Sequence, residues 1–221
     1  MTTLARPDTV LFDLDGTLVD SGPSIVAALR KAFAAEGVPA LPPEAERSLV
    51  GPPFYQTLPS LIGDATDRVV RTYRRIYVAD GFAFQAQVYP GIEALLDGLA
   101  RDQVRLAVAT SKLEPSAVAI LEHLGLADRF ATICGDTADA GRPTKAAVIA
   151  EALRRLGPAP GTTMVGDRSQ DVEGARAHHL PCVGAAWGYA APGELEAAGA
   201  VAVLPDPAAL AAAWAGAGTA A

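Results

Sequence analysis

The stretch Val10-Leu11-Phe12-Asp13-Leu14-Asp15-Gly16-Thr17-Leu18-Val19-Asp20-Ser21 lies near the start of this chain of 221 residues and decides its fold. Its first part is a short apolar run with a β-branched residue and an aromatic, which is typical of a buried strand. Side chains two positions apart share one side of a strand, so Asp13 and Asp15 would project together where the strand ends. Their repulsion needs a cation, a shared proton or solvent, and Gly16 allows a sharp turn. An ordinary polar turn fits the same residues, so the choice depends on the rest of the chain.

The composition favours a helix-rich α/β protein and argues against some partners. Half of the residues are hydrophobic and only 6% are aromatic, because alanine, a strong helix former, supplies much of the apolar content. The net charge of −7 and the pI of about 4.9 argue against nucleic acid or an anionic membrane as the main partner. No run approaches the roughly 20 apolar residues of a membrane span, and residues 1–7 lack the apolar core of a signal peptide. We expect a cytoplasmic protein with Cys134 and Cys182 as buried free thiols.

Strands and helices alternate from Gly91 onward. This alternation predicts a Rossmann-like parallel sheet flanked by helices on both faces. In such a sheet the ligand lies at the carboxyl ends of the strands, so the chemistry is expected where each strand stops. The expected strands are 104–109, 131–134, 162–165, 182–185 and, at the edge, 200–204, and the expected helices are 91–101, 115–124, 145–156, 171–179, 194–198 and 207–214.

The segment between Gly16 and Val88 differs from the rest because none of it is predicted as strand. Helical spacing of apolar residues, with breaks at glycine and proline, predicts helices over 24–36, from about 43, and over 64–80. The sequence therefore predicts a Rossmann-like core of residues 1–16 and 89–221, with a helical insert of residues 17–88 placed after the first strand.

Polar residues follow the second and third predicted strands of the core. Thr110 offers a hydroxyl and Ser111 a backbone N–H to a phosphate oxygen, although the pair would also serve as an ordinary helix N-cap. Further along, Arg142 and Lys145 lie at or just before the start of a predicted helix. The helix dipole disfavours cations there, so Lys145 is misplaced unless an anion lies nearby.

The fourth predicted strand ends in Gly166-Asp167-Arg168-Ser169-Gln170-Asp171. If a helix starts near Ser169, Asp171 lies about one turn beyond Asp167, and both carboxylates could face one point. With Asp13 and Asp15, four carboxylates then converge at one edge of the sheet. Such a set of hard oxygen ligands favours Mg²⁺ over zinc or copper. The three histidines are not needed and are predicted to be surface or packing residues.

Together these motifs resemble the haloacid dehalogenase-like (HAD) hydrolases, in particular the phosphoglycolate-phosphatase-like branch. The resemblance implies that Asp13 is the nucleophile that forms an aspartyl-phosphate and that Asp15 is the general acid and base. It implies that Thr110 orients the phosphoryl group and that Lys145 offsets negative charge. It further implies that Mg²⁺ is bound by Asp13, the backbone carbonyl of Asp15, Asp167 and Asp171, the last of these through a water molecule in some relatives.

Two departures from the family pattern leave choices open. Many relatives have Lys-Pro in the third motif, whereas this chain has Arg142-Pro143 followed by Lys145, so either cation could act there; Lys145 is preferred. Many relatives have Thr-Asn-Lys after the second strand, whereas this chain has Thr110-Ser111-Lys112, which keeps the backbone N–H. The second acidic residue, Asp15, argues against dehalogenases and phosphonatases, which resemble this fold but lack it, and favours a phosphate ester or anhydride.

In relatives the insert is a small helical cap over the site. The turn at Gly51-Pro52-Pro53-Phe54 resembles a cap loop that faces the substrate, although it could simply break a helix. Arg71, Arg74 and Arg75 are predicted to form a solvated helix face, with recognition of the leaving group as the less favoured alternative. The substrate-binding positions predicted from the motifs are Gly16, Gly51, Pro52, Ser111 and Arg142.

The resemblance predicts a Mg²⁺-dependent phosphatase for a small phosphorylated metabolite, either phosphoglycolate-like or a nucleoside monophosphate. A phosphomutase or another phosphotransferase of the same superfamily is an alternative, because the difference lies in the cap. A non-enzymatic phospho-acceptor or binding protein is another, since response-regulator receivers also place acidic residues, a Thr or Ser and a Lys at strand ends. The chain could be a monomer or a homodimer.

Overall fold

A computed structural model describes residues 4–137, 139 and 141–215 of the chain. Its centre is a six-stranded sheet in which every pair of neighbouring strands is parallel, and its order is β5-β4-β1-β6-β7-β8. The strands are β1 (Thr9–Phe12), β4 (Arg105–Leu113), β5 (Thr132–Asp136), β6 (Thr162–Gly166), β7 (Cys182–Ala185) and β8 (Ala202–Leu204). This arrangement confirms the predicted Rossmann-like α/β fold.

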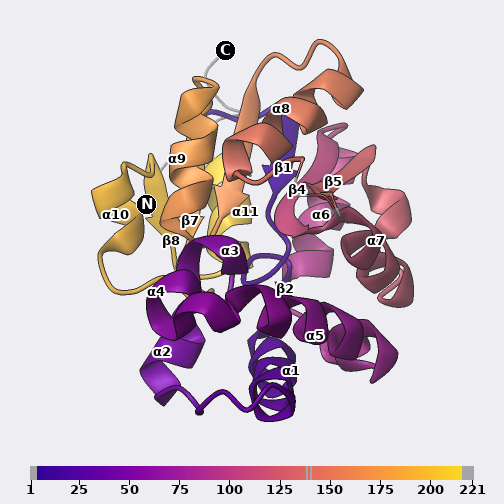
Figure 1. Ribbon diagram of the computed structural model, residues 1–221. Helices are drawn as coiled ribbons and strands as arrows, with labels where there is room; N and C mark the ends of the chain where they lie inside the picture. The colour runs from indigo at the N-terminus through magenta and orange to yellow at the C-terminus, as the bar shows by residue number, and fades with distance from the viewer. Residues whose placement is uncertain (1–3, 138, 140, 216–221) are drawn as a thin grey trace, which may run out of the picture.

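Helices cover both faces of this sheet (Figure 1). On one face, α8 (Lys145–Leu156), α9 (Ser169–Ala177) and α10 (Glu194–Ala198) pack on an apolar cluster that includes Leu11. On the other face, Val10 and Phe12 belong to a larger cluster with the remaining helices of the core. Successive residues of β1 thus point to opposite clusters, as the alternation of side chains along a strand requires. The remaining core helices are α6 (Ile92–Arg101), α7 (Glu114–His123) and α11 (Pro207–Ala215).

The helical insert leaves the core after β1 and lies at one end of the sheet (Figure 1). Its helices are α1 (Gly22–Ala35), α2 (Pro43–Ser48), α3 (Phe54–Thr57), α4 (Pro59–Ile62) and α5 (Thr66–Ala79), with 3₁₀ turns at Gly63–Ala65 and Phe82–Gln85. Their buried apolar side chains join the same cluster as Val10 and Phe12. The expectation that no strand lies between Gly16 and Val88 was wrong. The antiparallel pair β2 (Val19–Asp20) and β3 (Gln87–Val88) connects the insert to the core, and each strand is too short to show an alternating pattern.

Several other predicted boundaries also differ from those in the structure. β4 extends to Leu113 through an irregularity in its pairing after Ala109, so the Thr110-Ser111-Lys112 segment lies within the strand rather than after it. Helix α9 begins at Ser169 rather than 171, and β8 begins at Ala202 rather than 200. Within the described residues, both cysteines are buried free thiols, as predicted, and no helix is long and apolar enough to cross a membrane.

Candidate active site

Asp13 and Asp15 follow β1 at the end of the sheet that faces the insert. The backbone N–H of Asp13 donates to the carbonyl of Val165 in the neighbouring strand at 2.9 Å, which fixes where this carboxylate leaves the sheet. The two side chains are buried, with 4% and 6% of each residue exposed. Gly16 then turns with φ +88°, and a Cβ there would lie 2.1 Å from Asp167 Oδ2. Both the positive φ and the lack of space require glycine at this position.

Lys145 begins helix α8 and reaches back to the acidic residues. Its Nζ donates to Asp13 Oδ1 at 2.7 Å and to the carbonyl oxygen of Ala109 at 3.0 Å. The same Nζ lies 2.7 Å from Asp171 Oδ1, in a second buried ion pair. The cation that the helix dipole disfavours is thus compensated by two buried carboxylates. Burial alone would lower the pKa of Lys145, but the attraction of Asp13 and Asp171 raises it.

Asp13, Asp167 and Asp171 form a compact acidic cluster. Each offers an oxygen, and these oxygens all lie within 4.8 Å of one another. Burial raises the pKa of Asp13 to about 6 despite the opposing attraction of Lys145, and repulsion by Asp171 adds to the rise. Burial, followed by repulsion from Asp13 and Asp171, raises the pKa of Asp167 well above its usual value. Lys145 pairs with only two of these three buried carboxylates, Asp13 and Asp171, so an excess of negative charge remains. Their oxygens suit a hard divalent cation.

Asp15 lies outside this cluster and has its own partners. Its carboxylate is 2.8 Å from Lys112 Nζ and accepts a hydrogen bond from the Ser21 hydroxyl at 2.6 Å. Lys112 in turn lies against the ring of Tyr77, with Nζ 4.7 Å from the ring centroid. The side chain of Asp15 is thus held by Lys112 and Ser21 and is not one of the three clustered carboxylates. Its ligation of a metal through the backbone carbonyl remains a prediction.

Of the remaining predicted site residues, some line the cavity beside Asp15, whereas Arg142 lies elsewhere. Thr110 is buried, and its hydroxyl accepts the backbone N–H of Lys112 at 3.2 Å. Ser111, Gly51 and Pro52 line the same cavity as Asp15. Arg142 instead lies 3.0 Å from Glu114 and 3.8 Å from Glu151 in ion pairs on the core. The structure thus brings Lys145, and not Arg142, to Asp13.

A model of the family described as haloacid dehalogenase-like hydrolase matches residues 10–185 of this sequence. The chain belongs to this family. Among solved structures of similar chains, a predicted phosphatase from Clostridium acetobutylicum superposes with a TM-score of 0.88 at 32% identity, covering 94% of this chain and 98% of that one. The match includes all four motifs, because they lie between residues 10 and 185. In chain order, from first to fourth, they contain Asp13 and Asp15, Thr110 and Ser111, Arg142 and Lys145, and Asp167 and Asp171.

The chain is similar to two kinds of protein, a phosphatase and a kinase. Phosphoglycolate phosphatase of Rhodospirillum rubrum is 36% identical over 217 residues, covering 92% of this chain and 89% of that protein. Tyrosine-protein kinase PtkA of Mycobacterium tuberculosis is 43% identical over 185 residues, which cover 83% of this chain but 63% of PtkA. This chain thus spans less than two thirds of the length of PtkA. A solved structure of PtkA superposes with a TM-score of 0.83 at 38% identity, covering 95% of this chain and 98% of that one.

Tyr189, which follows β7, contacts the acidic cluster and was not predicted from the sequence. The backbone N–H of Tyr189 donates to Asp167 Oδ2 at 2.8 Å. Its hydroxyl accepts the N–H of Gly22 at 2.7 Å and donates to Asp20 in β2. Tyr189 therefore joins a carboxylate of the acidic cluster to the connection between core and insert. The rule that chemistry lies at strand ends would have pointed to it, because β7 ends at Ala185, only four residues earlier.

Arg168, which follows β6, was also not predicted, and it connects the fourth motif, Gly166 to Asp171, to the insert. Its guanidinium donates to the carbonyl of Val50 and to Glu194 Oε1, the latter at 2.9 Å. A Cβ on Gly51 would lie 2.9 Å from Arg168 Cγ, so the insert loop and the fourth motif are in close contact. No pattern in the sequence indicates this contact, because it joins segments more than 100 residues apart.

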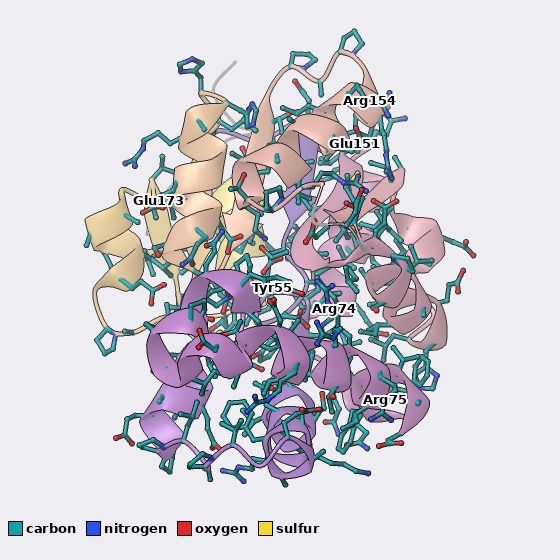
Figure 2. The ribbon with its side chains drawn as sticks, viewed as in Figure 1. Tyr55, Arg74, Arg75, Glu151, Arg154 and Glu173 are labelled. Carbon is teal, nitrogen blue, oxygen red and sulfur yellow. The ribbon has the colours of Figure 1, made fainter. Side chains whose placement is uncertain are left out.

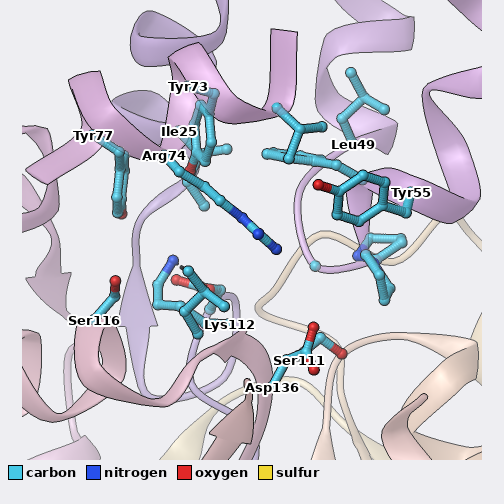
Figure 3. A pocket seen from close by; sticks show the side chains of 17 residues that line it. Ile25, Leu49, Tyr55, Tyr73, Arg74, Tyr77, Ser111, Lys112, Ser116 and Asp136 are labelled. Carbon is cyan, nitrogen blue, oxygen red and sulfur yellow. Dashed lines mark ion pairs between the residues drawn. The ribbon is translucent and has the colours of Figure 1, made fainter. Parts of the chain in front are cut away.

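A cavity lies between the insert and the core, beside Asp15 (Figure 3). Its apolar side is provided by the insert, where the ring of Phe54 packs edge-on against that of Tyr73 at 4.8 Å between centroids. Its polar side is provided by the core and includes Ser111, Lys112 and Asp136. The prediction of a solvated arginine face on α5 is confirmed for Arg71 and Arg75, which are exposed. It is wrong for Arg74, which is half-buried and lines this cavity.

Proposed function

We propose that this chain is a Mg²⁺-dependent phosphatase that hydrolyses a small phosphorylated metabolite through an aspartyl-phosphate. The observation that carries this proposal is the cluster of Asp13, Asp167 and Asp171, two of which pair with Lys145. This cluster lies beside an acid, Asp15, that lines a cavity. Residues 1–16 and 89–221 would form the catalytic core, and residues 17–88 its cap. The proposed substrates are phosphoglycolate-like esters or nucleoside monophosphates.

In the first half of the reaction, a carboxylate oxygen of Asp13 attacks phosphorus and the bond from phosphorus to the ester oxygen breaks. Asp15 gives a proton to that leaving oxygen, which departs as the alcohol. In the second half, Asp15 takes a proton from a water molecule that attacks the same phosphorus. Phosphate then leaves and the Asp13 carboxylate is regenerated. Lys145 stabilises the negative charge that Asp13 and the phosphoryl oxygens share.

The phosphoryl group needs hydrogen-bond donors as well as a nucleophile. The Thr110 hydroxyl and the Ser111 backbone N–H are the proposed donors at the end of β4, and Gly16 allows the chain after Asp15 to turn clear of the group. Mg²⁺, which Asp13, Asp167, Asp171 and the Asp15 carbonyl would hold, supplies positive charge between an anionic nucleophile and an anionic substrate. The cap would exclude bulk water while the intermediate exists.

A second candidate function is transfer of the phosphoryl group to an acceptor other than water. The similarity to tyrosine-protein kinase PtkA favours it, because that relative is named for transfer. Phosphoryl transfer would share the first half of the reaction, in which Asp13 takes up the phosphoryl group. It would differ in the second half, because an acceptor other than water attacks phosphorus. The shape of the closed cap would decide between the two, because it either admits or excludes water.

The test is a screen of phosphorylated metabolites with and without Mg²⁺, reading released phosphate, beside Asp13→Asn. Metal-dependent release that disappears in Asp13→Asn supports the phosphatase. Phosphorylation of Asp13 without release of phosphate to water would instead favour transfer or a phospho-acceptor role. If neither phosphate release nor phosphorylation of Asp13 is seen, both enzymatic hypotheses are overturned and a binding protein is left.

A further inference from the structure

The cavity beside Asp15 has one end at the acid and another at a basic residue of the insert. Asp15 is the group that would protonate the ester oxygen, so the alcohol part of a substrate has to extend from Asp15 into this cavity. Arg74 of α5 lines it as well. Figure 3 shows the guanidinium of Arg74 directed into the space between the insert and Lys112 and Ser111 of the core.

Arg74 has an unusual set of neighbours for a half-buried arginine. No carboxylate of the described residues lies within ion-pair distance of it, and no hydrogen bond to its guanidinium occurs among them. Its guanidinium carbon lies 5.3 Å from the centre of the Tyr55 ring. Such a contact covers one face of the guanidinium and leaves its N–H donors, which point outward in its plane, available. The Tyr55 ring thus holds the Arg74 side chain in the cavity but accepts no hydrogen bond from its N–H donors.

The other charges in the cavity already have partners. Lys112 is paired with Asp15 at 2.8 Å, so the two charges offset each other. Asp136 is the one remaining carboxylate of the lining, and its Oδ1 accepts the backbone N–H groups of Thr137 at 2.7 Å and Arg142 at 3.1 Å. Arg74 is therefore the cation of this lining that has no carboxylate partner among the described residues.

We propose that Arg74 recognises an anionic group on the alcohol part of the substrate, so that the preferred substrates are phosphate monoesters that carry a second anion such as a carboxylate. The inference rests on the proposed function and narrows it. Planar guanidinium donors match a carboxylate in two parallel hydrogen bonds. The aromatic and aliphatic side chains of Phe54, Tyr73 and Ile25 would pack on the carbon skeleton between the phosphate and that anion.

The helix itself provides the matched control. Arg75 is the next residue of α5, is exposed and does not line the cavity. Figure 2 shows Arg74 beside Tyr55, with Arg75 farther out on the insert. A long-range effect of positive charge on an anionic substrate would be reduced equally by Arg74→Gln and Arg75→Gln, whereas direct recognition depends on Arg74 alone.

The experiment compares two pairs of esters that differ in the charge of the alcohol part and scarcely in its size. One pair is 2-phosphoglycolate and its carboxamide, and the longer pair is 4-carboxyphenyl phosphate and its 4-carbamoyl analogue. We expect the wild type to prefer the carboxylate in at least one pair. Arg74→Gln should lower kcat/KM for that carboxylate by about ten- to a hundredfold and for its amide by less than about threefold. Arg74→Lys should recover part of the loss, and Arg75→Gln should match the wild type.

The outcomes separate this inference from the proposed function. Equal hydrolysis of carboxylate and amide by the wild type in both pairs, or equal losses in Arg74→Gln and Arg75→Gln, overturns the role of Arg74 while the phosphatase remains. Failure of the wild type to release phosphate from any ester with Mg²⁺ overturns the phosphatase. In that case, binding of glycolate and 4-hydroxybenzoate, measured by calorimetry in wild type and Arg74→Gln, tests the anion site on its own. Unchanged binding in the variant would overturn it.

Discussion

Lys112 Nζ lies 2.8 Å from Asp15 Oδ2, and the two side chains are only 8% and 9% exposed. Burial alone would lower the pKa of Lys112, but the attraction of Asp15 and the nearby Tyr77 and Tyr73 outweighs burial and raises it. The residue expected to act as the acid is thus held by a buried cation on one side and by the Ser21 hydroxyl on the other. Loss of either partner would leave the other charge largely buried and unpaired.

The first prediction concerns the ion pair between Lys112 and Asp15. Lys112→Met leaves the Asp15 carboxylate buried without a cation, and the free energy of unfolding should fall by about 3–5 kcal/mol. Adding Asp15→Asn to Lys112→Met should recover most of that loss, because the unpaired charge is removed. Urea denaturation of the wild type, both single variants and the double variant measures the coupling. Additive losses in the double variant would show that the pair contributes nothing to stability.

The second prediction decides between the two cations of the third motif. Lys145→Met should lower kcat by about a hundred- to a thousandfold, because Lys145 lies 2.7 Å from Asp13 and from Asp171. Arg142→Met removes ion pairs to Glu114 and Glu151 and should leave kcat within about threefold of the wild type. Steady-state phosphate release from the best ester checks both variants. A large loss of kcat in Arg142→Met would restore this residue to the substrate-binding role predicted from the sequence.

The third prediction concerns cation binding and pH. In the metal-free protein burial raises the pKa of Asp13 to about 6, above the ordinary value of 3.8. Between these two values the folded state binds more protons than the unfolded state, so the stability of the metal-free protein should fall as pH rises through this window. Protons and a cation compete for the same oxygens. Mg²⁺ should therefore raise Tm more at about pH 7.5 than at about pH 5.5.

Differential scanning fluorimetry of the metal-free protein and the Mg²⁺-loaded protein at both pH values measures this difference. NaCl at matched ionic strength is the control, because it screens charge without occupying the acidic cluster. An equal rise in Tm with NaCl, or a larger rise at the lower pH, would contradict cation binding by Asp13, Asp167 and Asp171.

The elements of the core were predictable because each has the length and pattern of its class. Helix Lys145–Leu156 and strand Cys182–Ala185 occur as predicted, the first with twelve residues of helical spacing ended by Gly157 and the second as an apolar run. β2 and β3 were missed because two residues cannot show an alternation, and their pairing depends on segments far apart in the sequence. Helices of four residues, such as Phe54–Thr57, lack a full period for the same reason.

The site was predictable where its residues follow strands and not where they act across the fold. Asp13, Asp167 and Asp171 meet because parallel strands end at one edge of the sheet, so their motifs were enough to place them together. Arg74 could not be separated from Arg71 and Arg75 by spacing, because only the position of the whole insert decides which of the three enters the cavity. The packing of the insert on the core, rather than the local sequence pattern, therefore determines that Arg74 lines the cavity.

The fourth prediction uses two glycines of the segment after β7. A Cβ on Gly188 would lie 2.4 Å from Asp167 Cβ and 2.4 Å from the carbonyl oxygen of Gly16, so Gly188→Ala has to displace Asp167 or the backbone of the first motif. A Cβ on Gly193 would meet nothing within 4 Å, and Gly193→Ala suffers only from its φ of +80°, at a cost of about 1 kcal/mol. Both variants therefore lose stability, but only Gly188→Ala should lose the rise in Tm with Mg²⁺ and the release of phosphate. Fluorimetry with and without Mg²⁺, read beside phosphate release, separates the two effects. A Mg²⁺-dependent rise in Gly188→Ala equal to that in Gly193→Ala would mean that Asp167 does not depend on this close approach.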